Sequence, residues 1–175
     1  RVVTLVSPLA PGADMALTEA VAIALAGRVG ELRLVVPEAV PYRVVLDVIA
    51  DETGGDRIAV SDAMLKRRRL LFDRFARVDI VRIGFTGKTE DSYRRDKQQF
   101  EAALVRANAY LARRTDLLGL LWDGAPGRGP GGTGDLVAFW RDPSIIPPHL
   151  DPGPSAVRPG PADREDALIA VPVTR

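Results

Sequence analysis

The residues best suited to hold a ligand lie at two points where an apolar run ends in glycine and a helical pattern begins. Gly131, Gly132 and Thr133 follow the apolar run at 117–122, and Gly12 and Asp14 follow the run at 2–6. Glycine allows the backbone to approach a ligand closely, and the free N–H groups that open a helix suit an anion such as phosphate. Both segments therefore predict binding corners between a strand and a helix, although a plain tight turn also explains a glycine-rich loop.

Four further residues beside these corners complete the predicted binding site. Trp122 either stacks on a base or caps the core, and Asp123 could accept a hydrogen bond from a ribose hydroxyl. Gly124 extends the same loop, and Asp135 is an acid at the start of the next helix. Asp14 has two readings, because a carboxylate at a helix start also stabilises the helix dipole.

Composition limits the chemistry that the chain can perform. With 175 residues and 46% hydrophobic residues it fits one domain, and the absence of cysteine excludes disulfides and thiolate metal sites. His149 is the only histidine, so a histidine metal cluster or a Ser-His-Asp triad is disfavoured. No acid is paired with a nucleophile. We therefore expect no catalytic residue, no metal and no separate cofactor.

The location and completeness of the chain give further expectations. No apolar run reaches the roughly 20 residues of a membrane span, and no signal peptide is visible. We expect a cytoplasmic protein without a membrane partner. The sequence starts at Arg1 inside an apolar run, which suggests a fragment of a longer protein. A homo-oligomer and a fused effector domain both stay open.

Hydrophobic periodicity predicts alternating strands and helices. We expect strands at 2–6, 32–36 (stopped by Pro37), 78–85, 117–122 and 167–173. We expect helices at 13–26, within 41–56, from an N-cap at Ser61 to 76, from Glu90 or Asp91 to 114, and at 134–140. This order predicts an α/β fold, a Rossmann-like and mostly parallel sheet with helices on both faces of a single domain. Residues 1–141 form that domain, residues 142–166 form a proline-rich loop, and residues 167–175 form a closing strand.

Positive charge is concentrated in the middle of the chain. Residues 66–114 contain 14 Lys and Arg against 6 Asp and Glu, whereas the net charge of the whole chain is only +1. The favoured interpretation is that these residues lie on the solvated outer faces of helices. Attraction of phosphate and binding of nucleic acid by the basic helices are the alternatives.

Several of these segments together resemble the SLOG superfamily, which includes DNA-processing protein A and the "lonely guy" proteins. Residues 5–14 are similar to its strand that ends in glycine–alanine–aspartate. Tyr93 and residues 108–111, 116–124 and 129–137 are similar to its second half, most strongly to that of bacterial sensor-type members. The resemblance covers most of residues 2–141.

The resemblance implies a Rossmann-like domain that holds a nucleotide or a nucleotide-derived signal, ADP-ribose-like or cyclic. Some relatives sense such signals in anti-phage defence, and others hydrolyse the N-glycosidic bond of nucleoside monophosphates. The hydrolases carry a proline–glycine–glycine–x–glycine–threonine loop with a glutamate three places on. Here Pro130 is followed by Gly131-Gly132-Thr133 without that insertion, and Leu136 stands in place of the glutamate. Binding is therefore favoured over hydrolysis.

Our leading hypothesis is a sensor module that binds a nucleotide-type small molecule. In this hypothesis Gly131, Gly132 and Thr133 hold phosphate, while Asp14, Trp122 and Asp123 contact the sugar or base. The first alternative is a nucleotide N-glycosidase that uses an acid such as Asp135. The second is a DNA-binding module without catalytic activity.

Overall fold

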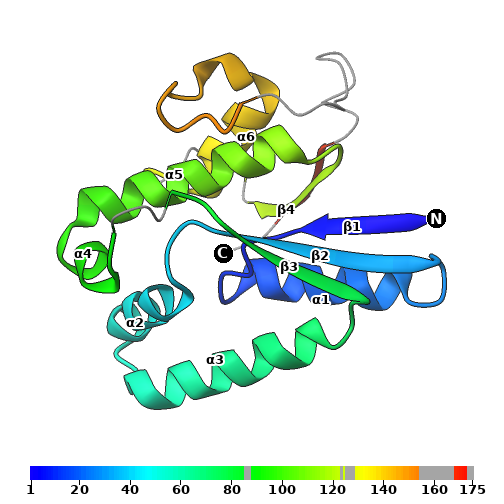
Figure 1. Cartoon of the computed structure of the whole chain (residues 1–175), viewed down its shortest axis with the longest axis horizontal. Helices are drawn as coiled ribbons and strands as arrows, with labels where there is room; N and C mark the ends of the chain where they lie inside the picture. Colours follow the sequence, from blue (N-terminus) through cyan, green and yellow to red (C-terminus); the bar gives the residue numbers. More distant parts are fainter. Residues whose placement is uncertain (85–87, 123, 125–128, 154–167, 173–175) are drawn as a thin grey trace. The chain divides into compact units, whose positions relative to one another are not determined.

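The computed structural model describes residues 1–84, 88–122, 124, 129–153 and 168–172. The predicted site residue Asp123 lies outside these ranges. The chain divides into two compact units, Arg1–Arg94 and Arg95–Arg175, and each is considered by itself. Both units combine helices with short parallel strands (Figure 1), so the predicted α/β class with parallel strands is confirmed.

The first unit is built on a three-stranded parallel sheet of order β1-β2-β3. Its elements in chain order are β1 (Val2–Val6), α1 (Ala13–Leu25), β2 (Glu31–Glu38), α2 (Tyr42–Thr53), α3 (Arg57–Phe72), β3 (Arg77–Arg82) and α4 (Glu90–Arg95). The strands β1 and β2 and the helix α1 lie where the apolar patterns predict them. The strand β3 ends at Arg82, before the predicted end at 85, and residue 85 is outside the described ranges.

Helices α1 and α3 pack on one face of this sheet (Figure 1). Leu34 and Val36 of β2 are fully buried against Met15 and Ala22 of α1 and Leu71 of α3. Alternate residues of a strand face opposite sides of a sheet, so the even-numbered positions of β2 form this core. The buried cluster fixes the carboxyl ends of β1 and β2 relative to the start of α1.

The prediction that Pro37 stops the second strand was wrong. Pro37 lies inside β2, opposite Val81 of β3. The hydrogen bond from Ser7 N–H to the Val35 carbonyl shows that the odd-numbered residues of β2 face β1. Because β1 ends at Val6, no ladder bond is lost where Pro37 lacks its N–H.

Two predicted helix starts also differ from the structure. Helix α3 begins after Asp56, whose carboxylate accepts the Ala59 N–H at 2.9 Å, and Ser61 lies inside the helix. The predicted long helix from Glu90 or Asp91 to 114 is two helices. Asp96 separates α4 from α5 (Lys97–Arg114), because its side chain caps α5 by accepting the Gln99 N–H at 3.0 Å.

The second unit contains a two-stranded parallel sheet. Its elements are α5, β4 (Leu118–Trp122), α6 (Thr133–Arg141), the short 3-10 helix η1 (Pro143–Ile145) and β5 (Leu168–Pro172). Strand β5 pairs with β4 in parallel, as expected of a last strand at 167–173. Helix α6 packs on α5, and Trp140 of α6 is 1% exposed. Residues 154–167, which precede β5 in the sequence of the second unit, are outside the described ranges.

Candidate functional site

The corner between β1 and α1 is held by a small network of polar groups. The hydroxyl oxygens of Ser7 and Thr18 lie 2.9 Å apart, and both residues are buried. The Ser7 hydroxyl also accepts the Leu9 N–H at 3.3 Å, while the Thr18 hydroxyl donates to the Asp14 carbonyl at 2.7 Å. Leu9 is fully buried with a φ of 53°, a conformation that costs energy for a branched side chain. Buried side chains and hydrogen bonds therefore hold this corner in place.

Gly12 and Asp14 form the outer part of the same corner. Gly12 is exposed, has a φ of +100°, and would place a Cβ in open space with no heavy atom within 4 Å. Asp14 is partly buried in the first turn of α1. Burial raises the pKa of its carboxyl from 3.8 to about 6, although a hydrogen bond with the Ala10 backbone acts in the opposite direction. The corner thus offers open backbone beside a carboxyl group that gives up its proton near neutral pH.

The corner before α6 is organised differently, because its glycines have structural partners. A Cβ on Gly131, whose φ is +80°, would lie 2.3 Å from the Leu104 Cβ of α5. The Gly131 N–H donates to the Asp135 carboxylate at 2.7 Å, and the Asn108 side-chain amide donates to the Gly132 carbonyl at 3.0 Å. Close packing of α6 on α5 therefore accounts for Gly131, and Asp135 occupies its N–H.

The remaining predicted residues lie around the ends of β4 and α6. Helix α6 begins one residue before the predicted range of 134–140, since Gly132 is the N-cap residue and Thr133 is the exposed first residue of the helix. Trp122 ends β4, is partly buried, and lies opposite Pro172 of β5. Gly124 is exposed with a φ of +78° and has open space around a Cβ position.

The predicted site residues are divided between the two units. Gly12 and Asp14 belong to Arg1–Arg94 and lie two residues apart at one corner. The members of the second group belong to Arg95–Arg175 and are Trp122, Gly124, Gly131, Gly132, Thr133 and Asp135. That the two groups form one site stays a prediction.

Sequence reasoning missed a cluster around Arg68, which it treated as part of a basic run. The side chain of Arg68 is buried in the first unit, with its guanidinium carbon 4.1 Å from the Tyr42 ring centre and 5.3 Å from that of Phe72. Its Nη2 lies 3.4 Å from the Glu38 carboxylate at the end of β2. Tyr42 and Glu38 are far from Arg68 in the sequence, so no local sequence pattern predicted this cluster.

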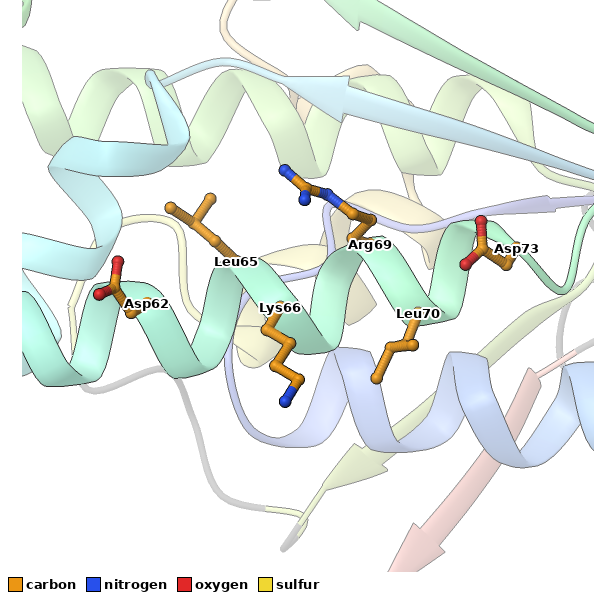
Figure 2. A pocket seen from close by; sticks show the side chains of 6 residues that line it. All are labelled: Asp62, Leu65, Lys66, Arg69, Leu70 and Asp73. Atoms are coloured by element: carbon orange, nitrogen blue, oxygen red, sulfur yellow. The ribbon is translucent and has the colours of Figure 1, made fainter.

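The other members of the basic run point in different directions. Arg67 pairs with Glu19 of α1 at 3.2 Å, whereas Lys66 and Arg69 are exposed along α3. An open hollow of about 560 Å³ follows this helix (Figure 2). The side chains that line it are Asp62, Leu65, Lys66, Arg69, Leu70 and Asp73.

The composition of this hollow bears on the DNA-binding alternative. Asp62 and Asp73 flank Lys66 and Arg69 on the same helix (Figure 2), so the described surface of α3 does not gather its cations into one patch. A second hollow of about 490 Å³ lies where α1 ends and β2 begins. Neither of these two hollows is lined by a residue predicted for the site.

Three further findings bear on function, and they concern metal-binding clusters, membrane-spanning helices and similarity to known proteins. In the described part of the chain, no three acidic, histidine or cysteine side chains gather where they could hold a metal ion. No described helix combines the length and apolar character needed to cross a membrane. No protein-family model, curated protein or solved structure matches this chain. The resemblance drawn from the sequence therefore stands alone.

Proposed function

We propose that this protein binds a nucleotide or a nucleotide-derived signal, and that the corner between β1 and α1 is the centre of the site. The fold proposed is the Rossmann-like fold of the SLOG superfamily, in a cytoplasmic sensor module. The observation that carries the proposal is the difference between the two glycines, because Gly12 has open space around it whereas Gly131 packs on α5. The acid of each corner has a backbone hydrogen bond.

The contrast is physical. Gly131 is a glycine because helix α5 leaves no room for a Cβ, and Asp135 is an acid that accepts the Gly131 N–H. Gly12 has open space around it, so packing does not require a glycine there. Its exposed backbone and the carboxyl of Asp14 lie beyond the carboxyl end of a parallel strand, where open α/β sheets bind ligands.

Topology within the units supports the fold that is proposed. The first sheet has the order β3-β2-β1 when it is read from its far edge, and the second sheet has the order β4-β5. All three pairings are parallel. The classic dinucleotide-binding sheet contains the same two partial orders in 3-2-1-4-5-6.

The role of Asp14 in this proposal is to bind a ligand hydroxyl. An ionised carboxylate accepts hydrogen bonds, whereas a protonated one can also donate. A pKa near 6 therefore makes the contact with a ribose hydroxyl sensitive to pH in the neutral range. The exposed Thr133 hydroxyl remains the candidate phosphate contact of the second corner.

The alternatives receive less support. Asp135, the acid suggested for a nucleotide N-glycosidase, already accepts a backbone N–H. The basic run on α3 is divided between an ion pair, a buried arginine and a surface that includes two aspartates. Binding without catalysis is thus the function that the geometry supports best.

The test is calorimetry with AMP and ADP-ribose, on the wild type and on two glycine variants. Gly12→Ala strains the proposed site, and Gly27→Ala is its control, since Gly27 also has a positive φ and open surroundings but lies at the other end of α1. We expect Gly12→Ala to weaken binding at least tenfold and Gly27→Ala to leave it unchanged. If no member of the panel binds the wild type below about 1 mM, which corresponds to about 4 kcal/mol, the proposal fails.

A further inference from the structure

Arg68 is the most deeply buried arginine of the described chain that forms an ion pair, yet its ion pair, at 3.4 Å, is longer than most others that the described arginines form. The residue is 9% exposed, and its contact with a carboxylate joins Nη2 to Glu38 at 3.4 Å. Its Nε is buried without a hydrogen-bond partner among the described residues. By contrast, the exposed Arg57 binds both oxygens of Asp51 at 2.7 and 2.8 Å.

This order is the reverse of what electrostatics favours. A charge removed from water is stable only when other groups replace its lost hydrogen bonds, so a buried guanidinium needs better partners than an exposed one. The rings of Tyr42 and Phe72 stabilise the cation through their faces, but they accept no N–H bond along the edge of the guanidinium. The described residues therefore leave part of the hydrogen-bonding capacity of Arg68 unused.

The cluster also lies at the ligand-binding edge of the first sheet. Glu38 is the last residue of β2, and Tyr42 is the first residue of α2. The Tyr42 hydroxyl lies 3.7 Å from the sulfur of Met15, which follows Asp14 in the first turn of α1. A short series of contacts thus connects Arg68 with the corner that contains Asp14, inside one unit.

We propose that Arg68 binds the phosphate group of the nucleotide, an inference that rests on the proposed function. The planar guanidinium matches the geometry of phosphate oxygens and binds two of them at once. Glu38 contacts the guanidinium through Nη2 at 3.4 Å, and Nε is a buried donor without a partner among the described residues. A phosphate that binds Nε must therefore displace the atoms that cover it. Arg67 also lies near this cluster, since both Arg68 and Arg67 lower the pKa of Tyr42 against the larger effect of burial, and Arg67 pairs with Glu19 at 3.2 Å.

The experiment compares AMP with adenosine, which differ by the phosphate. We expect the wild type to bind AMP at least tenfold more tightly than adenosine, and Arg68→Met to remove that difference while adenosine binding is kept. Arg68→Lys keeps the charge but loses the planar fork, so it should retain only part of the preference. Arg57→Met, on the exposed start of the same helix, is the control and should keep the full preference.

Two outcomes separate this inference from the proposed function. If Arg68→Met weakens AMP and adenosine equally, or changes neither, Arg68 does not bind phosphate even though the nucleotide site stands. If the wild type binds neither compound, the proposed function fails, and pyrophosphate alone then tests the arginine. A rise in melting temperature with pyrophosphate that is larger in the wild type than in Arg68→Lys supports an anion site at Arg68, and no rise in the wild type, or an equal rise in Arg68→Lys, overturns it.

If Arg68→Met does not fold, Arg68→Lys and the wild type carry the comparison. An AMP preference in Arg68→Lys equal to that of the wild type would then contradict the inference, and a reduced preference would support it.

Discussion

Replacing Gly131 with alanine should destabilise the second unit more than any other glycine substitution tested in the same unit. The new Cβ would lie 2.3 Å from the Leu104 Cβ, 2.9 Å from the Leu104 carbonyl carbon and 3.0 Å from the Val105 nitrogen. These neighbours are mostly helix backbone and cannot rotate away. A left-handed backbone costs alanine about 1–2 kcal/mol, and overpacking adds about 1–3 kcal/mol. We therefore expect a loss of about 2–5 kcal/mol in the free energy of unfolding.

Gly153→Ala is the matched control for this prediction. Gly153 has a φ of +81°, against +80° for Gly131, but has open space around a Cβ position. It should therefore lose only the backbone part, about 1–2 kcal/mol. Urea denaturation followed by tryptophan fluorescence measures the effect on the correct unit, because Trp122 and Trp140 both lie in Arg95–Arg175.

The comparison also tests why Gly131 is a glycine. If the two variants lose the same free energy to within about 0.5 kcal/mol, contact with α5 does not constrain this position. Close packing on α5 would then not explain why residue 131 is a glycine, and approach of a ligand would again be the better explanation for Gly131.

Substitutions at three further residues test the remaining structural claims. Asp14→Asn should raise the free energy of unfolding at pH 7. The pKa of the Asp14 carboxyl is raised from 3.8 to about 6, so the wild type loses stability as pH rises through this interval, by at most about 3 kcal/mol. Urea denaturation at pH 4 and pH 7 should show a smaller difference in the variant than in the wild type. Asp135→Ala should lower the free energy of unfolding by about 1 kcal/mol by freeing the Gly131 N–H, and Asp135→Asn should recover part of this loss in the same assay. Asp96→Ala should lower the free energy of unfolding by about 1 kcal/mol, because it leaves the Gln99 N–H at the start of α5 without its acceptor. Circular dichroism should show reduced helicity. An unchanged spectrum and an unchanged denaturation midpoint would show that Asp96 does not separate the helices.

Much of the secondary structure follows from local patterns. The strand at 2–6 and the helix that starts at Ala13 were predicted because alternating or helical spacing of apolar residues reflects which face is buried. Helix α2 lies inside the predicted range 41–56 and ends at Gly54, a residue that is free to adopt a left-handed φ, which is +65° here. The helix starts were harder, because several polar residues could serve as caps and only the fold selects one of them.

Pro37 shows why strand ends depend on neighbouring strands. Taken alone, a proline without an N–H predicts the end of a strand. In β2 that missing N–H faces the side where β1 has already ended, so the strand continues to Glu38 without losing a bond. This depends on the register between two strands, which a single segment does not contain.

The sequence by itself determined the alternation of helices and strands and the location of both glycine corners, because backbone freedom and apolar spacing act over a few neighbouring residues. Only the tertiary structure distinguished the corners, because Gly131 packs against helix α5, at Leu104, which lies more than twenty residues earlier in the chain. It likewise separated Arg68 from the basic run around it. The cost of burying a charge depends on which residues surround it, and those residues are brought together by folding.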